Sequence, residues 1–357
     1  MPGVSIVICC HNSRARLGET LGHLVRQVVP AGLPWEVIVV DNGSTDDTSA
    51  AAEKIWAASS SAAPLRVISE PRLGLSFARA RGLREARYDF VSLVDDDNWV
   101  GPDWVRLVSE IMTAQPRAGA CGGISEAAFE KTPPNWFAQF SRSFAVGELT
   151  PEAADVTWSK GYLWGAGLSI RKPAWQKLHA EGFIPLLQDR SGSSLSSGGD
   201  TELCRALRLA GWQLHYDPRL RLQHFMPAGR LTWDYLRRLR HAFGASSVAI
   251  EAYDLALRSD GSPFRRLVRE SWAFQFSWTL KELLHCRTRA WSKNRRNAEG
   301  DAVALQAEWL LGRLGELRRH PASCRKMVGS IRRAGWRDAQ VCVPALPPRP
   351  SSAPVMA

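Results

Sequence analysis

Short apolar runs alternate with amphipathic stretches through the first hundred residues, and this alternation limits the possible folds more than any other feature. Four runs rich in β-branched residues predict strands at 4–10, 36–40, 65–68 and 90–94. The stretches between them have the spacing of amphipathic helices, at about 17–28, 45–56 and 73–86. Strand and helix in alternation are typical of βαβ units. The sequence therefore predicts an α/β fold, a Rossmann-like and mostly parallel sheet flanked by helices.

The rest of the chain predicts a second half of the same domain, followed by a helical extension. An apolar segment spans 162–170, a Ser- and Gly-rich loop spans 189–199, a helix is expected over 201–210, and two strand-like runs surround Leu214 and Leu222. Helical periods follow at 231–257, 264–286 and 302–317. The expected organisation is a domain over 1–226 with halves at 1–118 and 119–226, a basic helical extension over 227–340, and a disordered Pro-rich tail over 341–357.

Composition places the chain among ordinary folded proteins, with 45% hydrophobic and 23% charged residues. No apolar run is long enough to span a bilayer, and the seven cysteines show no metal-binding spacing, so we expect a cytoplasmic protein. The net charge of +11 is concentrated in residues 225–357, which carry +12. This asymmetry is compatible with an anionic partner such as a membrane surface, or with a solvated helical face.

Three consecutive carboxylates, Asp95, Asp96 and Asp97, follow the predicted strand at 90–94. Like charges this close repel one another, so something cationic is needed to hold them together. Hard divalent cations such as Mg²⁺ or Mn²⁺ take oxygen ligands and often bridge carboxylates to phosphates. The alternative is an acidic loop or helix cap. In an open α/β sheet, ligands bind outside the carboxyl ends of the strands, which favours the metal interpretation.

Polar residues also follow the first two strands. His11 and Asn12 end the first strand, and Asp41 and Asn42 end the second. Asp41 could accept hydrogen bonds from a base or sugar and His11 could stack on a base, whereas a turn or cap is the alternative for each. Because several polar strand ends converge, the pattern favours a binding site. No P-loop and no G-x-G-x-x-G motif follows the first strand, which disfavours phosphoryl transfer and dinucleotide binding.

Further candidates lie downstream. Asp200 begins a helix after the flexible loop, where it is either a helix cap or a general base, and Glu202 competes for that role. His224 is a candidate third metal ligand or phosphate contact, although a lone histidine is more often structural. Trp164, followed by Gly165, could offer a face for stacking on a sugar.

Five segments in this order resemble the motifs of inverting family 2 glycosyltransferases of the GT-A fold, including bacterial enzymes of polysaccharide and cell-wall glycan assembly. These segments are 4–12, 36–46, 74–81, 95–98 and 199–211. The resemblance implies metal-dependent transfer of one sugar from a nucleotide-sugar donor to a glycan or lipid-linked saccharide acceptor. The processive signature Gln-x-x-Arg-Trp is absent, which favours a single sugar per encounter.

Roles follow from the resemblance residue by residue. It implies Asp200 as the general base, Asp97 as the ligand of Mn²⁺ or Mg²⁺ on the diphosphate, Asp41 and His11 as contacts of the nucleoside, and Asp95 as a contact of the ribose or metal. From their positions we add His224 as a candidate metal ligand, Trp164, Gly165 and Glu202 as expected acceptor contacts, and Asn12, Asn42, Arg79 and Asp96 as expected donor contacts. The sequence departs from the family pattern at Asn42, where a second Asp is frequent, and at Gly199, where Glu often precedes the base.

Two other functions and two interpretations of the C-terminal helices stay open. The chain could be an inactive module that binds nucleotide-sugars or glycans, or it could be a nucleotidyltransferase. A nucleotidyltransferase would need a Gly-rich basic loop after the first strand, and residues 12–18 match such a loop poorly. The basic clusters beside Trp272, Phe274, Phe276 and Trp278 could contact a membrane peripherally, at the inner face of the plasma membrane, or could pack those aromatic rings against the catalytic domain. No motif predicts nucleic-acid binding.

Overall fold

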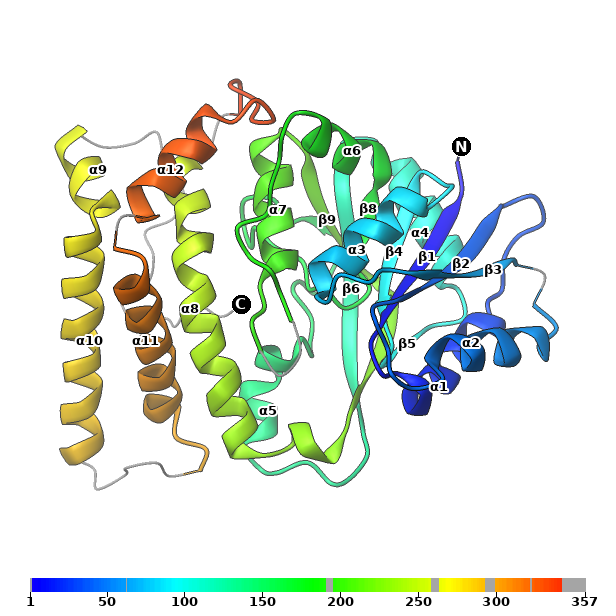
Figure 1. Cartoon of the computed structure of the whole chain (residues 1–357), viewed down its shortest axis with the longest axis horizontal. Helices are drawn as coiled ribbons and strands as arrows, with labels where there is room; N and C mark the ends of the chain where they lie inside the picture. The colour runs from blue at the N-terminus through cyan, green and yellow to red at the C-terminus, as the bar shows by residue number, and fades with distance from the viewer. Residues whose placement is uncertain are drawn as a thin grey trace.

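The computed structural model describes residues 2–61, 63–190, 195–257, 263–292, 299–321 and 323–341. A mixed sheet with strand order β3-β2-β1-β4-β8-β6-β9-β5 runs through the centre of the molecule, and β7 pairs with β9 (Figure 1). The strands are β1 (Val4–Cys10), β2 (Trp35–Asp41), β3 (Leu65–Ser69), β4 (Phe90–Asp95), β5 (Asn98–Val100), β6 (Ala118–Phe129), β7 (Ala154–Asp155), β8 (Ser169–Arg171) and β9 (Gln213–Met226). Strands β3, β2, β1 and β4 are parallel, which confirms the predicted α/β fold.

Helices cover both faces of the sheet. Two short 3₁₀ turns also occur, η1 (Ser141–Phe144) before β7 and η2 (Ala228–Arg230) between β9 and α8. The helices are α1 (Arg14–Val25), α2 (Thr48–Ala57), α3 (Leu75–Glu85), α4 (Trp104–Ala114), α5 (Phe137–Phe140), α6 (Lys172–Ala180), α7 (Gly199–Leu209), α8 (Trp233–Leu257), α9 (Pro263–Glu270), α10 (Trp272–Ser292), α11 (Ala302–Arg319) and α12 (Ser323–Arg333). None of them, within the described ranges, has the length and apolarity that a membrane-spanning helix needs.

The side-chain alternation of the strands divides the core into two layers. On β1, Val7 faces one layer, whereas Ile6 and Ile8 face the other. Helices α3, α6, α7, α8 and α12 pack on the first layer, and α1, α2 and α4 pack on the second. Both faces of β1, β2 and β4 are therefore buried, which is why these strands are mostly apolar.

The structure differs from the sequence prediction in element boundaries and in several elements that the sequence did not indicate. The two strand-like runs near Leu214 and Leu222 form one long strand, β9, which pairs with β6 through irregularities in register. The helix expected over 264–286 is divided at Ser271 into α9 and α10, and the expected apolar segment 162–170 contributes only the start of β8. Elements that were not predicted include β5, β6, α4, α6 and α12. Residues 342–357 of the tail predicted over 341–357, and residues 191–194 of the predicted loop, lie outside the described residues.

The C-terminal helices stand side by side beside α7, at the end of the molecule opposite β3 (Figure 1). The chain after α12 then returns to the α/β domain, where Trp336 packs edge-on against Phe183 and joins the first core layer. The Asp338 amide also donates to the Leu209 carbonyl, at 2.9 Å. The boundary at residue 226 stays a prediction, and the hydrophobic core continues across it.

Two glycines allow α8 and α11 to cross closely. A Cβ atom at Gly244 would lie 1.8 Å from the Trp309 carbonyl oxygen, and one at Gly312 would lie 1.9 Å from that of His241. At Gly315, also on α11, nothing lies within 4 Å of the added atom. The contact between the helices therefore depends on the two missing side chains.

We predict that Gly312→Ala lowers the free energy of unfolding by about 2 to 3 kcal/mol, because the helices must separate to accommodate the new methyl group. Gly315→Ala is the matched control and should be neutral or stabilising by up to about 1 kcal/mol, through helix propensity alone. Urea unfolding of both variants provides the measurement. Equal stability of the two variants would contradict the close crossing.

Candidate functional site

The three consecutive carboxylates lie on the tight turn between β4 and β5, and each is paired with a different arginine. Arg79 Nη2 of α3 lies 3.6 Å from Asp95 Oδ1, and Arg16 Nη2 of α1 lies 2.7 Å from Asp96 Oδ2. Asp97 Oδ2 is 2.9 Å from Arg230 Nη2, and His224 Nε2 is 3.5 Å from Asp97 Oδ1. The protein itself thus supplies the positive charge that the sequence required.

These pairings act against the cost of burial. Burial raises the pKa of Asp95, and Arg79 partly offsets it. Burial and the neighbouring Asp97 likewise raise the pKa of Asp96. Burial would also raise the pKa of Asp97, but His224 and Arg230 outweigh it and hold that pKa below its usual value. Asp97 is therefore the member of the triplet most firmly held as a carboxylate.

The ends of β1 and β2 lie beside this turn. His11 Nδ1 is 2.8 Å from the Asn42 carbonyl oxygen, and Asn12 Oδ1 accepts a hydrogen bond from the Thr45 amide at 2.7 Å. Ser13 donates to Asp96 through its hydroxyl group. These contacts bring the strand ends predicted to bind the donor together at one edge of the sheet.

Asp41 and Asn42 have different surroundings. Asp41 accepts from the Ser44 amide at 2.9 Å and from the Ser49 hydroxyl at 2.5 Å. Burial would raise the pKa of Asp41, but these hydrogen bonds outweigh it and lower that pKa. The partly exposed carboxylate is thus kept ionised and oriented at the strand end.

The Asn42 amide is buried and fully engaged within the protein. Its Nδ2 donates to the carbonyl oxygens of Glu70 and Arg72, at 2.9 and 2.7 Å, and its Oδ1 accepts from the Gly74 amide at 2.8 Å. The structure therefore corrects the expected donor contact by this side chain. A carboxylate cannot donate, which explains why this position is Asn and not Asp.

Asp200 begins α7 and is held by two backbone amides. Its Oδ2 accepts from Gly165 and its Oδ1 from Thr201, both at 2.7 Å. A Cβ atom at Gly165 would lie 2.8 Å from Asp200 Oδ2, so only glycine permits this approach. Gly165 thus contacts the predicted base.

Arg79 connects the two sides of the site. Besides Asp95, its guanidinium contacts Asp189, with Nη1 and Oδ2 3.2 Å apart. Asp189 Oδ1 accepts from the Gly199 amide at 2.8 Å, directly before Asp200. A Cβ atom at Gly199 would lie 2.2 Å from Asp189 Oδ2. The Asp189 carboxylate thus occupies the space that a side chain at residue 199 would need.

Two expected acceptor contacts are internal. Trp164 is 6% exposed and packs in the first core layer, so its indole has no open face for a sugar. Glu202 is 1% exposed and accepts from the amides of Leu186 and Leu187, at 2.6 and 2.9 Å, and from the Tyr253 hydroxyl at 2.6 Å. Burial raises the pKa of Glu202 despite these hydrogen bonds. Glu202 anchors the backbone before Asp189 to α8, which corrects the expected role.

The donor atoms around Asp97 suit a divalent cation shared with a ligand. Among the described residues, no group of three His, Cys, Asp or Glu side chains is placed to hold a metal ion. Asp97 and His224 offer an oxygen and a nitrogen, and Arg230 Nη1 lies 3.2 Å from His224 Nε2. A guanidinium can only donate, so Nε2 accepts from it, and could ligate a metal, in the neutral ring with its proton on Nδ1, whereas a protonated ring pairs with Asp97 instead. The pair fits a cation whose remaining ligands come from phosphate and water.

Sequence reasoning missed the cationic partners of the triplet and the anchor of the loop. Arg16, Arg230 and Asp189 lie far from the Asp motif along the chain, in segments with no motif of their own. The only sequence signal for these partners was the triplet itself, because three adjacent carboxylates need positive charge nearby when they are buried.

The sequence matches two family descriptions. Glycosyl transferase family 2 matches residues 5–174, and Glycosyl transferase family group 2 matches residues 90–307, more than half of the chain. The chain belongs to the family 2 glycosyltransferases. The turn with the three carboxylates lies within both matches, as does the segment from β8 to the start of α6.

Relatives of this glycosyltransferase include proteins of polysaccharide synthesis. It is 26% identical to the succinoglycan biosynthesis protein ExoM of Rhizobium meliloti over 66% of this chain and 72% of ExoM. It is 36% identical to the hyaluronan synthase of Pasteurella multocida, over 31% of this chain and 11% of that protein. The mannosyltransferase PcManGT from Pyrobaculum calidifontis, solved with GDP-Man and Mn²⁺, shares the fold with a TM-score of 0.52 and 18% identity, over 88% of this chain and 87% of that one.

We predict that Asn42→Asp lowers the free energy of unfolding by about 2 kcal/mol, because two buried carbonyl oxygens lose their donor and face a carboxylate. Asn135→Asp makes the same chemical change at an exposed position and should be nearly neutral. Urea unfolding at neutral pH gives the comparison. Equal stability of the two variants would show that the Asn42 amide does not hold the segment 70–74.

Proposed function

We propose that this glycosyltransferase moves one sugar, with inversion, from a nucleotide-sugar to a hydroxyl group of a glycan or lipid-linked saccharide in surface polysaccharide assembly. The observation that supports this most is the link from Asp95 through Arg79 and Asp189 to Asp200. It joins the carboxylate turn, where a donor diphosphate is expected, to the helix start that carries a candidate base.

The donor half of the proposal rests on the strand ends. Asp41 is ionised and oriented at the end of β2, where it suits a hydrogen-bond acceptor for the nucleoside. His11 is exposed beside it and offers a ring for the base. Asp95 keeps a partly exposed carboxylate at the end of β4, within reach of a ribose hydroxyl or a cation.

A divalent cation held by Asp97 and His224 would neutralise charge on the leaving diphosphate. Arg230 contacts both side chains, so it is positioned to add positive charge at the same place. The Mn²⁺ and GDP-Man named for PcManGT support a cation and a nucleotide-sugar of this kind. The name of ExoM supports polysaccharide assembly.

The acceptor half rests on Asp200. Two amides fix the orientation of its carboxylate, and each oxygen keeps a further lone pair for the acceptor hydroxyl. The base removes the proton as the hydroxyl oxygen attacks the anomeric carbon, and the bond to the diphosphate breaks on the opposite face. Asp189 and Gly199, at the two ends of this loop, contact each other beside Asp200.

The alternative is a binding module without catalysis. It would need the carboxylate turn but has no use for a carboxylate oriented like that of Asp200. A panel of UDP-, dTDP- and GDP-sugars with Mn²⁺, monitored for release of nucleoside diphosphate, separates the two functions. Binding of a donor with no turnover, even with candidate acceptors present, would favour the module.

We predict that Asp200→Asn lowers kcat by about 10² to 10⁴-fold, because the amide cannot accept the proton, and leaves nucleoside diphosphate affinity unchanged. Asp234→Asn removes the same charge from an exposed position of α8 and should retain full activity. Steady-state kinetics on the donor that the panel identifies provide the measurement. Undiminished transfer by Asp200→Asn would exclude it as the base.

We predict that Asp97→Asn abolishes the gain in nucleoside diphosphate affinity that Mn²⁺ provides, since a cation ligand is lost. Isothermal titration with and without Mn²⁺ gives the two affinities, and Asp200→Asn serves as the control that keeps the gain. An unchanged effect of Mn²⁺ in the Asp97 variant would place the cation elsewhere.

A further inference from the structure

Apolar side chains gather on the outer surface of α9 and α10. Of the thirteen large apolar side chains exposed within the described residues, six belong to these two helices. They are Phe264, Leu267, Phe274, Trp278, Leu280 and Leu284. The surfaces of soluble monomeric proteins rarely expose large apolar side chains in such a cluster unless the cluster binds a partner.

The aromatic residues of α10 divide between two roles. Trp272 and Phe276 face inward, where their rings stack at 5.0 Å and the Trp272 indole donates to the Leu317 carbonyl at 2.7 Å. Phe274 and Trp278 are 44% and 43% exposed on the opposite side of the helix. Packing of α10 against the rest of the molecule therefore explains only two of the four rings.

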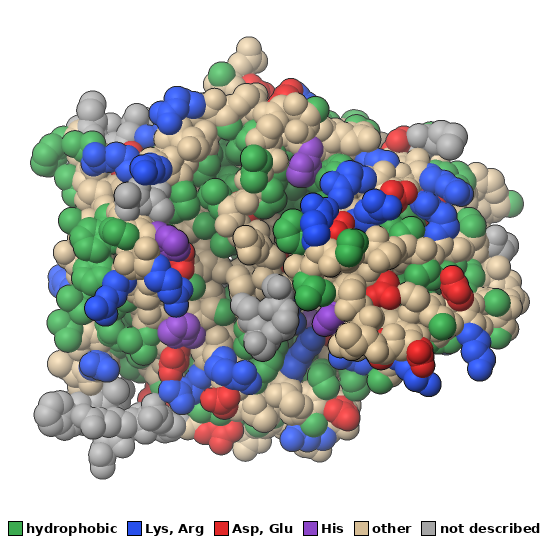
Figure 2. Space-filling view, in the orientation of Figure 1, with side chains coloured by type: hydrophobic (Ala, Val, Ile, Leu, Met, Phe, Trp, Pro, Cys, Tyr) green, Lys and Arg blue, Asp and Glu red, His purple; other side chains and the backbone are tan. Residues whose placement is uncertain are grey.

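Positive charge accompanies the exposed apolar groups. The sequence of α9 and α10 has six Lys or Arg against two Glu, and Lys281 and Arg287 are exposed on α10. Figure 2 shows hydrophobic side chains interspersed with Lys and Arg along the edge formed by these helices. A second copy of the chain on this face would bring like charges together, which disfavours a symmetric dimer.

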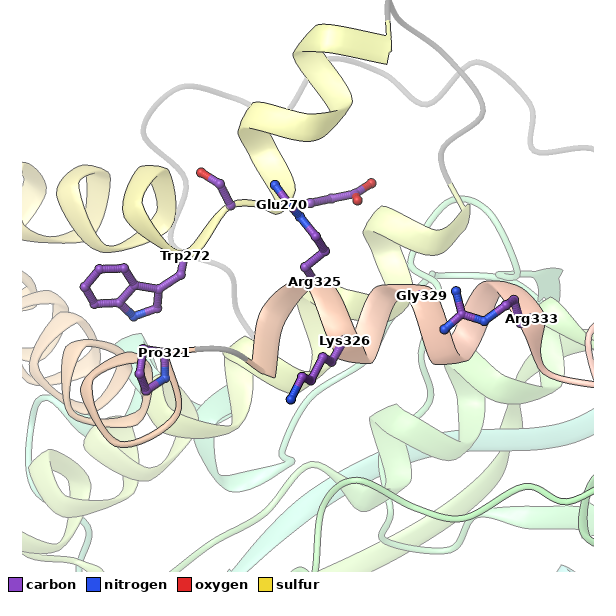
Figure 3. A pocket seen from close by; sticks show the side chains of 8 residues that line it. Glu270, Trp272, Pro321, Arg325, Lys326, Gly329 and Arg333 are labelled. Carbon is purple, nitrogen blue, oxygen red and sulfur yellow. The ribbon is translucent and has the colours of Figure 1, made fainter.

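A basic hollow of about 630 Å³ opens at the start of α10, between the α9–α10 turn and α12. Arg325, Lys326 and Arg333 of α12 line it together with Trp272 (Figure 3). Within the described part of the chain, none of these three cations has an ion-pair partner, and the Glu270 carboxylate in the wall pairs with Arg332 at 2.6 Å. The hollow therefore suits an anionic group.

We propose that α9, α10 and α12 form a docking surface for an anionic lipid bilayer. Phe274 and Trp278 insert among the lipid headgroups, and the hollow at Arg325 and Lys326 receives a phosphate headgroup. Amphipathic surfaces that combine aromatic and basic side chains bind membranes in this way. The surface lies outside the crevice of the carboxylate turn, so the inference does not depend on the proposed function.

Co-sedimentation of the full chain with phosphatidylcholine vesicles, with and without phosphatidylglycerol, tests the proposal. We expect binding to the anionic vesicles, and weaker binding in high salt. Phe274→Ser with Trp278→Ser should reduce the affinity at least about tenfold, and Arg325→Gln with Lys326→Gln should remove most of the preference for phosphatidylglycerol. Ile184→Ser, which removes a more exposed apolar side chain elsewhere, should change nothing.

Three outcomes would overturn the proposal. One is no binding of the wild-type chain to either vesicle. Another is equal binding by the wild type and the aromatic double variant, with unchanged circular dichroism as the control for folding. A third is a wild-type dimer in solution that the double variant dissociates, which would assign the face to a second copy. If inorganic phosphate alone releases the chain from the vesicles, the hollow binds a free anion, which would contradict its assignment to a lipid headgroup.

Discussion

Three adjacent carboxylates on the β4–β5 turn create the electrostatic constraint on which the site depends. Burial penalises each negative charge, and each charge also opposes its neighbours. The protein meets this constraint with cations from three separate segments, Arg16 of α1, Arg79 of α3 and Arg230 after β9. The triplet thereby links α1 and α3 to the segment that follows β9, and the protein itself compensates the negative charge of the turn.

The same constraint connects the carboxylate turn to the start of α7. Arg79 balances Asp95 and also holds Asp189, whose carboxylate fits only because residue 199 is glycine. Asp200 follows directly and approaches the backbone only because residue 165 is glycine. Missing side chains are thus as important as charges in setting the position of the candidate base.

Sequence reasoning reached the parts of the fold that depend on local patterns. The four parallel strands were predicted from apolar runs and from the polar residues that end them, because a strand buried on both faces has a distinctive composition. It could not assign the internal roles of Asn42, Trp164 and Glu202, because each depends on partners that are distant in sequence. It foresaw the need for a cation at the triplet but could not identify the arginines that meet it.

The central claim is that the carboxylate turn binds the diphosphate of a nucleotide-sugar together with a divalent cation. Anomalous diffraction from crystals grown with Mn²⁺ and a nucleoside diphosphate tests it most directly. The account predicts one strong Mn²⁺ peak in contact with Asp97 and the diphosphate oxygens. A nucleotide bound at the ends of β1 and β2 with no Mn²⁺ peak at this turn would contradict the claim.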